Sequence, residues 1–141
     1  MLDRDLILRK ISELEEYLSQ LREVKDITLE DFLKDWKVQR AVERILQISI
    51  EICIDIANHI ISSEDWRVPV SYSDTLRVLK ENKVIDDELF NIMERMVKFR
   101  NIIVHNYDRI DQAVIINILR NNLNDFVRYK DSIIEWISKR E

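Results

Sequence analysis

The chain has 141 residues, of which 46% are hydrophobic and 35% are charged, so it is long enough for one ordinary domain with an apolar core. It contains no glycine and one proline, Pro69, which excludes a fold rich in tight turns and favours long helices joined by few loops. The formal net charge of −5 excludes a basic nucleic-acid footprint spread over the whole chain, so any contact with RNA must use a local basic patch.

The first helical segments are predicted from the spacing of apolar residues. Over about residues 3–25, apolar residues recur at steps of four and three, which places them on one stripe of a helix. Thr28 followed by Asp31 resembles a capping box and marks the start of a second helical region over about residues 29–63. The stripe of the first helix comprises Ile7, Ile11, Leu14, Leu18 and Leu21.

Residues 48–56 are the most ambiguous stretch, because isoleucine at every other position is typical of a strand. No glycine or proline bounds the stretch, helix-forming residues continue on both sides, and a polar stripe runs through it at steps of three and four. We therefore predict a helix that is apolar on both flanks of this stripe. Since one bundle covers only one such flank fully, we expect a second copy to cover the other in a homodimer. The polar stripe comprises Arg44, Gln47, Glu51, Asp55 and Asn58.

A break follows at residues 63–75, where serines cluster around Pro69. Ser73 or Asp74 is expected to cap a short third helix that ends near Asn82.

Two further helices complete the prediction. The fourth begins near Asp86 and Asp87, whose carboxylates suit a helix N-terminus, and it continues into the segment RNIIVHNY. A last helix over about residues 112–139 carries an apolar stripe with a skip around Tyr129 and Lys130. The sequence therefore predicts an all-α fold, an up-and-down bundle of about five helices. The last stripe comprises Ile115, Leu119, Leu123, Phe126, Ile133 and Ile137.

Other features bound the class of protein. The one cysteine, Cys53, excludes an internal disulfide and is expected to be a small buried hydrophobe. Charges at residues 3–5 interrupt the start of the chain, so no signal peptide is predicted, and no uncharged run is long enough to span a membrane. We expect a cytoplasmic protein without membrane contact, with one domain over residues 1–141.

The segment RNIIVHNY gathers the side chains suited to chemistry. On a helix, Asn101 and His105 share a face because they are four residues apart, and Arg100 and Tyr107 nearly share one. Arg100 and His105 point about 140° from each other on a helix. A long arginine, a kink or a second copy of the site can close that gap. The other histidine, His59, lies in an apolar helix and is expected to be structural.

An arginine and a histidine in this setting suit cleavage of the RNA backbone. A guanidinium can bind phosphate oxygens and stabilise charge in the transition state. A histidine with a pKa near about 6.5 can exchange protons at neutral pH. RNA supplies its own nucleophile, the 2′-hydroxyl, so neither a metal nor another cofactor is required. The local basic patch is expected from Arg95, Lys98, Arg100 and Arg109.

Glu51 and Asp55 form a carboxylate pair four residues apart, which could bind a metal or act as acid and base. No second pair with ligand spacing accompanies them. We therefore expect no metal site, and instead expect one of the two carboxylates to pair with Arg100 or Arg44 across the bundle.

The segment from Arg100 to Tyr107 matches an Arg-x4-His-x-Tyr motif and resembles the HEPN superfamily in its HepT-like toxin branch. The polar Asn101 after the arginine, the chain length, and the motif late in the fourth of five helices agree with that resemblance. It implies a homodimeric, metal-independent ribonuclease in which Arg100 and His105 are catalytic and Asn101 is supporting. It also implies a minimal nucleotidyltransferase antitoxin as partner, which can attach AMP to Tyr107.

Two other interpretations stay open at this point. The chain could be a non-catalytic helical dimer that binds a nucleotide or docks a nucleotidyltransferase, which the acidic net charge fits. It could also be a purely structural bundle. The intact motif separates the ribonuclease from the structural bundle, but it does not separate the ribonuclease from the binding module.

Overall fold

A computed structural model describes residues 2–140, which are helical with no strand among them, as predicted. The five longer helices correspond to the five expected from the sequence, and short helical elements join them. The longer helices are α1 (Arg4–Glu23), α3 (Trp36–Ser63), α4 (Tyr72–Glu81), α5 (Asp87–His105) and α7 (Leu123–Lys139). The short elements are α2 (Leu29–Lys34), a 3₁₀ turn η1 (Tyr107–Arg109), α6 (Gln112–Asn117) and a π-helical turn η2 (Ile118–Asn122).

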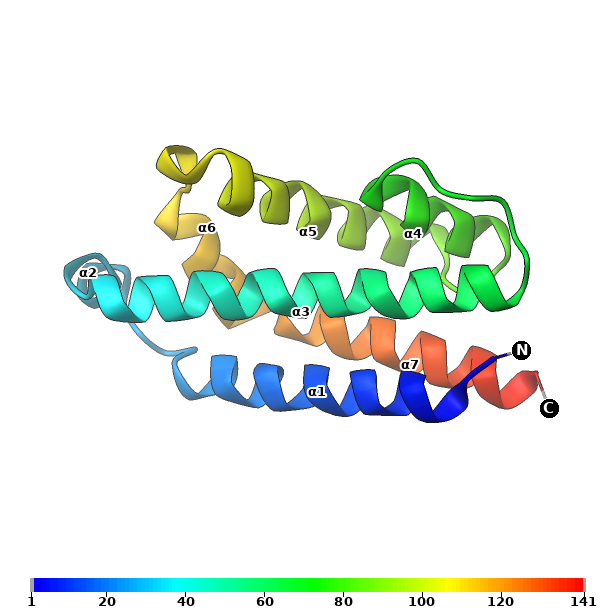
Figure 1. Ribbon diagram of the computed structural model, residues 1–141. Helices are drawn as coiled ribbons and strands as arrows, with labels where there is room; N and C mark the ends of the chain where they lie inside the picture. The colour runs from blue at the N-terminus through cyan, green and yellow to red at the C-terminus, as the bar shows by residue number, and fades with distance from the viewer. Residues whose placement is uncertain (1, 141) are drawn as a thin grey trace.

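Helix α3 runs through the middle of the bundle (Figure 1). It packs against α1 on one side and against α4 and α5 on another, while α7 contacts both α1 and α5. The predicted stripe of α1 faces this core, since all five of its apolar residues are buried.

The alternating isoleucines of residues 48–56 lie within α3, so the helix prediction is confirmed. Ile50, Ile52, Ile54 and Ile56 are all buried inside the single chain. On a helix these four positions point in different directions, so the chain itself covers both flanks of the polar stripe. The argument that a second copy must cover one flank is therefore wrong, because α1 and the α4–α5 pair together enclose the helix.

Helix α3 also meets the length and composition criteria for a membrane span, as the one such helix in the described part of the chain. The core helix of a soluble protein passes the same test. Because α3 lies at the centre of the bundle, its apolar character is accounted for by the core, and the feature is weak support for a membrane span.

Side-chain caps decide where the helices begin. Thr28 caps α2 and Asp86 caps α5, each accepting a hydrogen bond from a backbone N–H three residues ahead, as expected. The region 29–63 is not one helix, because the chain leaves the helical conformation at Asp35, whose carboxylate caps α3 at 3.2 Å from the Val38 nitrogen. The expectation for α4 is also wrong, since its cap is Ser71 rather than Ser73 or Asp74.

The apolar stripe predicted for the last helix is buried throughout, but the helix is interrupted by the π-helical turn η2. Ile115, Leu119 and Leu123 are spaced by two steps of four, which drift around an α-helix. The wider π turn keeps them on the core side. Tyr129 fills the skip in the stripe: it is fully buried, and its hydroxyl donates a 2.8 Å hydrogen bond to the backbone carbonyl of Cys53.

Cys53 is itself fully buried and unpaired, as expected. Burial raises the pKa of its thiol far above the ordinary range, which keeps the sulfur in the unreactive thiol form.

Replacing Tyr129 by phenylalanine removes the bond between α7 and α3 without changing the packed ring. We expect Tyr129→Phe to lower the free energy of unfolding by about 1 kcal/mol, the usual net value of a buried hydrogen bond. Urea denaturation measures the change. Tyr17→Phe is the matched control, because the Tyr17 hydroxyl bonds to no residue in the range 2–140, and it should leave the midpoint nearly unchanged. Equal effects of the two variants would contradict the role assigned to the Tyr129 hydroxyl.

Candidate functional site

The residues of the motif lie at the C-terminal end of α5 and in η1, at the same end of the bundle as α2 and the start of α3 (Figure 1). Arg100, Asn101 and His105 belong to α5, and His105 is its last residue. Tyr107 lies beyond the helix, in η1. The expected helical face shared by Arg100 and Tyr107 is therefore wrong, because α5 ends before Tyr107 is reached.

Arg100 is held between two other elements. Its Nε and Nη2 atoms donate to one carboxylate oxygen of Glu51 on α3, at 2.9 and 2.7 Å. The ring of Tyr72, at the start of α4, stacks on the guanidinium at 4.8 Å from its centroid. Gln47 donates to the same Glu51 oxygen at 3.1 Å. The predicted pairing of Glu51 with Arg100 is confirmed. Glu51 holds one edge of the guanidinium, and the ring of Tyr72 covers one of its faces.

The guanidinium still has donors to offer. An arginine has five N–H donors, and three of them are used here, two by Glu51 and one by the side-chain oxygen of Asn101 at 3.1 Å. The other two are available for a ligand, and the Arg100 side chain is 15% exposed. Asn101 supports Arg100 rather than His105, since no hydrogen bond joins Asn101 to His105 in the described part of the chain.

His105 and His59 differ in their surroundings. His105 is exposed, and its imidazole makes no hydrogen bond to any residue that the structure describes. His59 accepts a hydrogen bond from the backbone nitrogen of Asp3 at 3.2 Å. The structural role expected for His59 is confirmed, which leaves His105 as the histidine suited to proton transfer.

Tyr107 is 45% exposed, and an arginine of α3 covers its ring. The Cζ atom of Arg40 lies 4.6 Å from the ring centroid. The buried carboxylate of Glu43 orients Arg40, which donates hydrogen bonds to its two oxygens at 2.9 and 3.1 Å. Glu43 also accepts from the amide of Gln112 at 3.0 Å. Tyr107 is thus anchored through its ring.

Sequence reasoning missed two residues that touch the motif, Arg40 and Tyr72. Arg40 could have been found, because it extends the polar stripe of α3 by one step of four before Arg44. Tyr72 carried no signal, since it lies at the edge of the serine-rich break and reaches Arg100 only through the packing of α4 on α5.

The four residues expected to form a basic patch do not share one face, because Arg95, Lys98 and Arg100 point in different directions from α5 and Arg109 lies beyond the helix, in η1. Lys98 and Arg100 are two residues apart on a helix and so point about 160° from each other. Lys98 pairs with Glu94 at 3.8 Å, and Arg95 lines a hollow of about 240 Å³ against α6, η2 and α7. From a distant part of the sequence, the fold brings Arg40 to the motif.

The two carboxylates considered for a metal are each paired with a cation. Glu51 binds Arg100, and Asp55 lies 3.7 Å from the Nζ atom of Lys10 on α1. In the part of the chain that the structure describes, no three His, Cys, Asp or Glu side chains gather as metal ligands. The pairing explains both carboxylates as parts of the helix interfaces.

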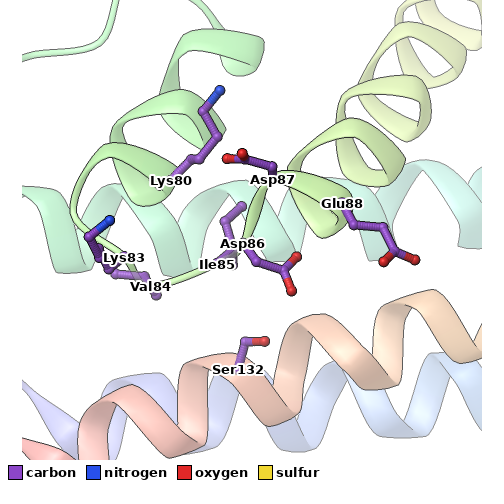
Figure 2. Close-up of a pocket in the computed structure, with 8 residues that line it drawn as sticks. All are labelled: Lys80, Lys83, Val84, Ile85, Asp86, Asp87, Glu88 and Ser132. Carbon is purple, nitrogen blue, oxygen red and sulfur yellow. The ribbon is translucent and has the colours of Figure 1, made fainter.

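A hollow of about 650 Å³ lies at the turn between α4 and α5 and against α7 (Figure 2). Lys80 and Lys83 line one side of it, Asp87 and Glu88 another, and Ser132 lies across from the turn. It opens at the start of α5, whereas the motif lies at the other end of this 19-residue helix, about 27 Å away. The hollow is therefore separate from the candidate site.

Comparison with known proteins decides the family. A family model described as ribonuclease HepT-like matches residues 8–133. The chain belongs to the ribonuclease HepT-like family. The motif that holds Arg100, His105 and Tyr107 lies within the matched range, so the resemblance to the HepT-like branch of the HEPN superfamily is confirmed.

Named relatives of this HepT-like chain include two nucleases. It is 31% identical over 129 residues to the mRNA nuclease HepT of Shewanella oneidensis, covering 92% of this chain and 96% of that protein. It is 26% identical over 121 residues to the tRNA nuclease HepT of Aphanizomenon flos-aquae, covering 86% of this chain and 82% of that protein. A solved structure of a tri-AMPylated Shewanella oneidensis HEPN toxin in complex with MNT antitoxin matches with a TM-score of 0.87 and 30% identity, over 94% of this chain and 99% of that chain.

A charge network joins the loop before α4 to the first turn of that helix, which also carries Tyr72. Both terminal nitrogens of Arg67 donate to the Asp74 carboxylate at 2.9 Å, and the backbone nitrogen of Val70 donates to it at 3.0 Å. These hydrogen bonds lower the pKa of Asp74 well below its ordinary value, and those from Arg67 have the largest effect.

Since the folded pKa of Asp74 lies below its unfolded value of about 3.9, the group stabilises the fold above that pH. That stability is lost as the pH falls through and below about 4. Asp74→Asn should therefore be less stable than the native protein at pH 7, with a difference that shrinks as the pH is lowered below about 4. Urea midpoints at a series of pH values measure it. Asp26→Asn, at an exposed position, is the control. If the difference in unfolding free energy between the native protein and Asp74→Asn does not change with pH, the stabilising role of the Asp74 carboxylate is refuted.

Proposed function

We propose that this chain is the ribonuclease toxin of a toxin–antitoxin pair and cleaves RNA without a metal. The observation that carries the proposal is the geometry at the end of α5. Arg100 is fixed by Glu51 and Tyr72 with two donors free, and five residues further along the helix His105 is exposed and unpaired. The names of the relatives as mRNA and tRNA nucleases support the same substrate class.

In the proposed reaction the RNA supplies the nucleophile. Arg100 binds the non-bridging oxygens of the scissile phosphate and stabilises the negative charge that develops on them. His105 takes the proton from the 2′-hydroxyl, whose oxygen attacks the phosphorus, or donates a proton to the departing 5′-oxygen, and water makes the other proton transfer. The bond to that oxygen breaks, and the products are a 2′,3′-cyclic phosphate and a 5′-hydroxyl. Asn101 supports the reaction by orienting Arg100.

We propose a homodimer in which the motifs of two copies come together. The two reactive side chains point apart on one helix, and a second copy can supply the complementary partner. Exposed apolar side chains at the motif end of the bundle, on α2, α3 and α5, are available for this contact. They include Leu33, Trp36 and Val104.

We further propose that a minimal nucleotidyltransferase of the MNT type is the antitoxin and that Tyr107 is its AMP acceptor. The relative solved with MNT antitoxin is tri-AMPylated, which supports this chemistry. The phenol oxygen of Tyr107 attacks the α-phosphorus of ATP, a phosphodiester to AMP forms, and pyrophosphate leaves. The added phosphate brings negative charge to the region where RNA phosphate binds. RNA and ATP are both cytoplasmic, so we propose that the protein acts in the cytoplasm. We also propose that residues 1–141 form one HEPN-like domain.

The catalytic assignment is tested by substitution. His105→Ala should lower the cleavage rate by about 10²–10⁴-fold through loss of proton transfer. Arg100→Ala should lower it by about 10²–10³-fold through loss of charge stabilisation. Cleavage of cellular RNA and of a defined RNA by purified protein measures both. Arg95→Ala, a change of the same kind on another face of α5, should retain activity.

The same assay separates the mechanism from its rivals. EDTA should have no effect, and a substrate with a 2′-deoxy sugar at the scissile position should resist cleavage. Cleavage of DNA and RNA alike, or dependence on Mg²⁺, would remove the proposed mechanism. Absence of cleavage by a protein that still binds the nucleotidyltransferase would favour the alternative, a non-catalytic dimer that docks this partner.

The modification is tested by mass. Incubation with the cognate nucleotidyltransferase and ATP should add one or more AMP units, and Tyr107→Phe should abolish the gain because the acceptor oxygen is gone. Tyr72→Phe, which keeps its ring beside Arg100, is the control and should still be modified. A mass gain that persists in Tyr107→Phe would assign the acceptor elsewhere.

A further inference from the structure

The polar stripe of α3, extended to Arg40, contacts the motif at two points. Glu51 binds Arg100, and Arg40 stacks on Tyr107. Arg40 precedes Glu51 in the sequence, whereas its partner Tyr107 follows Arg100. The segment of α3 and the motif therefore lie antiparallel along one seam. The part of the stripe between Arg40 and Glu51 therefore borders the same seam.

Arg44 occupies the middle of this stripe. Arg40, Arg44, Gln47 and Glu51 are spaced by four, three and four residues, which keeps them within a sector of about 60° around the helix. Because the first and last of these residues contact the motif, Arg44 lies on the side of α3 that faces it.

The two arginines differ in what they already bind. Arg44 is exposed and makes no hydrogen bond or ion pair with any residue in the range 2–140. Arg40 pairs with Glu43, yet its side chain remains 46% exposed while that of Glu43 is only 4% exposed. Glu43 thus holds Arg40 from the protein side and leaves donors of its guanidinium facing outward. Arg40 and Arg44 thus present outward-facing guanidinium donors beside the motif.

We propose that Arg40 and Arg44 form a second phosphate-binding subsite, which holds backbone phosphates of the RNA next to the scissile one. The proposal rests on the proposed function and specifies how its substrate is held. Guanidinium groups bind phosphate oxygens through paired N–H donors. The two arginines are about 6 Å apart along the helix axis, at 1.5 Å per residue, which is comparable to the spacing of successive phosphates in an RNA strand. Such contacts fix the register of the strand without reading its sequence.

The subsite also gives a physical reason for the effect of modifying Tyr107. A phosphate attached to the phenol would lie beside Arg40, whose guanidinium already covers the ring at 4.6 Å. That phosphate would satisfy the charge of Arg40 and compete with the RNA for the subsite. An acidic protein surface is a different ligand for the same arginines, and the test below separates it from RNA.

The experiment measures RNA binding without cleavage. Each variant is made in the His105→Ala background and titrated with a labelled single-stranded RNA at several salt concentrations. The slope of log Kd against log salt changes by about 0.7 for each single-strand phosphate contact. Arg44→Gln should weaken binding and lower the slope by about 0.7, and the Arg40→Gln/Arg44→Gln double variant by about 1.4. Arg44→Lys should keep the slope, because it keeps the charge. Arg95→Gln is the control with the same charge change away from the seam.

Three outcomes would overturn the subsite. One is an unchanged affinity and slope in Arg44→Gln, and another is an equal change in Arg95→Gln. The third is an unchanged slope together with lost binding of the nucleotidyltransferase, which would assign Arg44 to a protein interface. If the parent protein cleaves RNA while any of these holds, only the subsite fails. If the parent neither cleaves nor binds RNA, the proposed function fails with it.

Discussion

The burial of α3 is the constraint on which both the fold and the site depend. This helix is enclosed by α1 on one side and by α4 and α5 on another, so a polar residue that faces these neighbours, such as Glu51, lies in a seam between helices. A partly buried carboxylate such as Glu51 loses hydration and needs a charged or hydrogen-bonding partner. Arg100 supplies that partner from α5 and is itself immobilised by the contact. The Glu51–Arg100 pair thus compensates a partly buried carboxylate on α3. The same pair orients the arginine that is proposed to bind phosphate.

The periodicity of apolar and polar residues within single helices accounts for most of what could be predicted about the fold from the sequence. The stripe of α1 and the helical nature of residues 48–56 follow from the spacing of residues within one element, and the structure agrees with both. The stacking of Arg40 on Tyr107 joins two elements that are distant in the sequence, and spacing along one helix does not encode such a contact. The prediction of a basic patch failed for a different reason, because its members were grouped by nearness in sequence rather than by helical face.

The absence of glycine does not prevent sharp helix ends in this chain. Asp65 and Lys83 adopt positive φ angles of 60° and 63°, the left-handed conformation that glycine usually takes after a helix. In each case the next residue closes the turn, with Trp66 bonding back to Ile61 and Val84 bonding back to Leu79. Val84 is buried, so side-chain packing after the turn compensates for the unfavourable backbone conformation.

The placement of the chain ends has a practical consequence for handling the protein. The start of α1 and the end of α7 lie together at one end of the bundle, whereas the end of α5 and η1 lie at the opposite end (Figure 1). A fluorophore, an affinity tag or a sensor surface joined to either terminus is therefore separated from His105 by the length of α5. Immobilisation through a terminus presents the reactive end to the solution, so binding measured on a chip and binding measured in free solution can be compared directly.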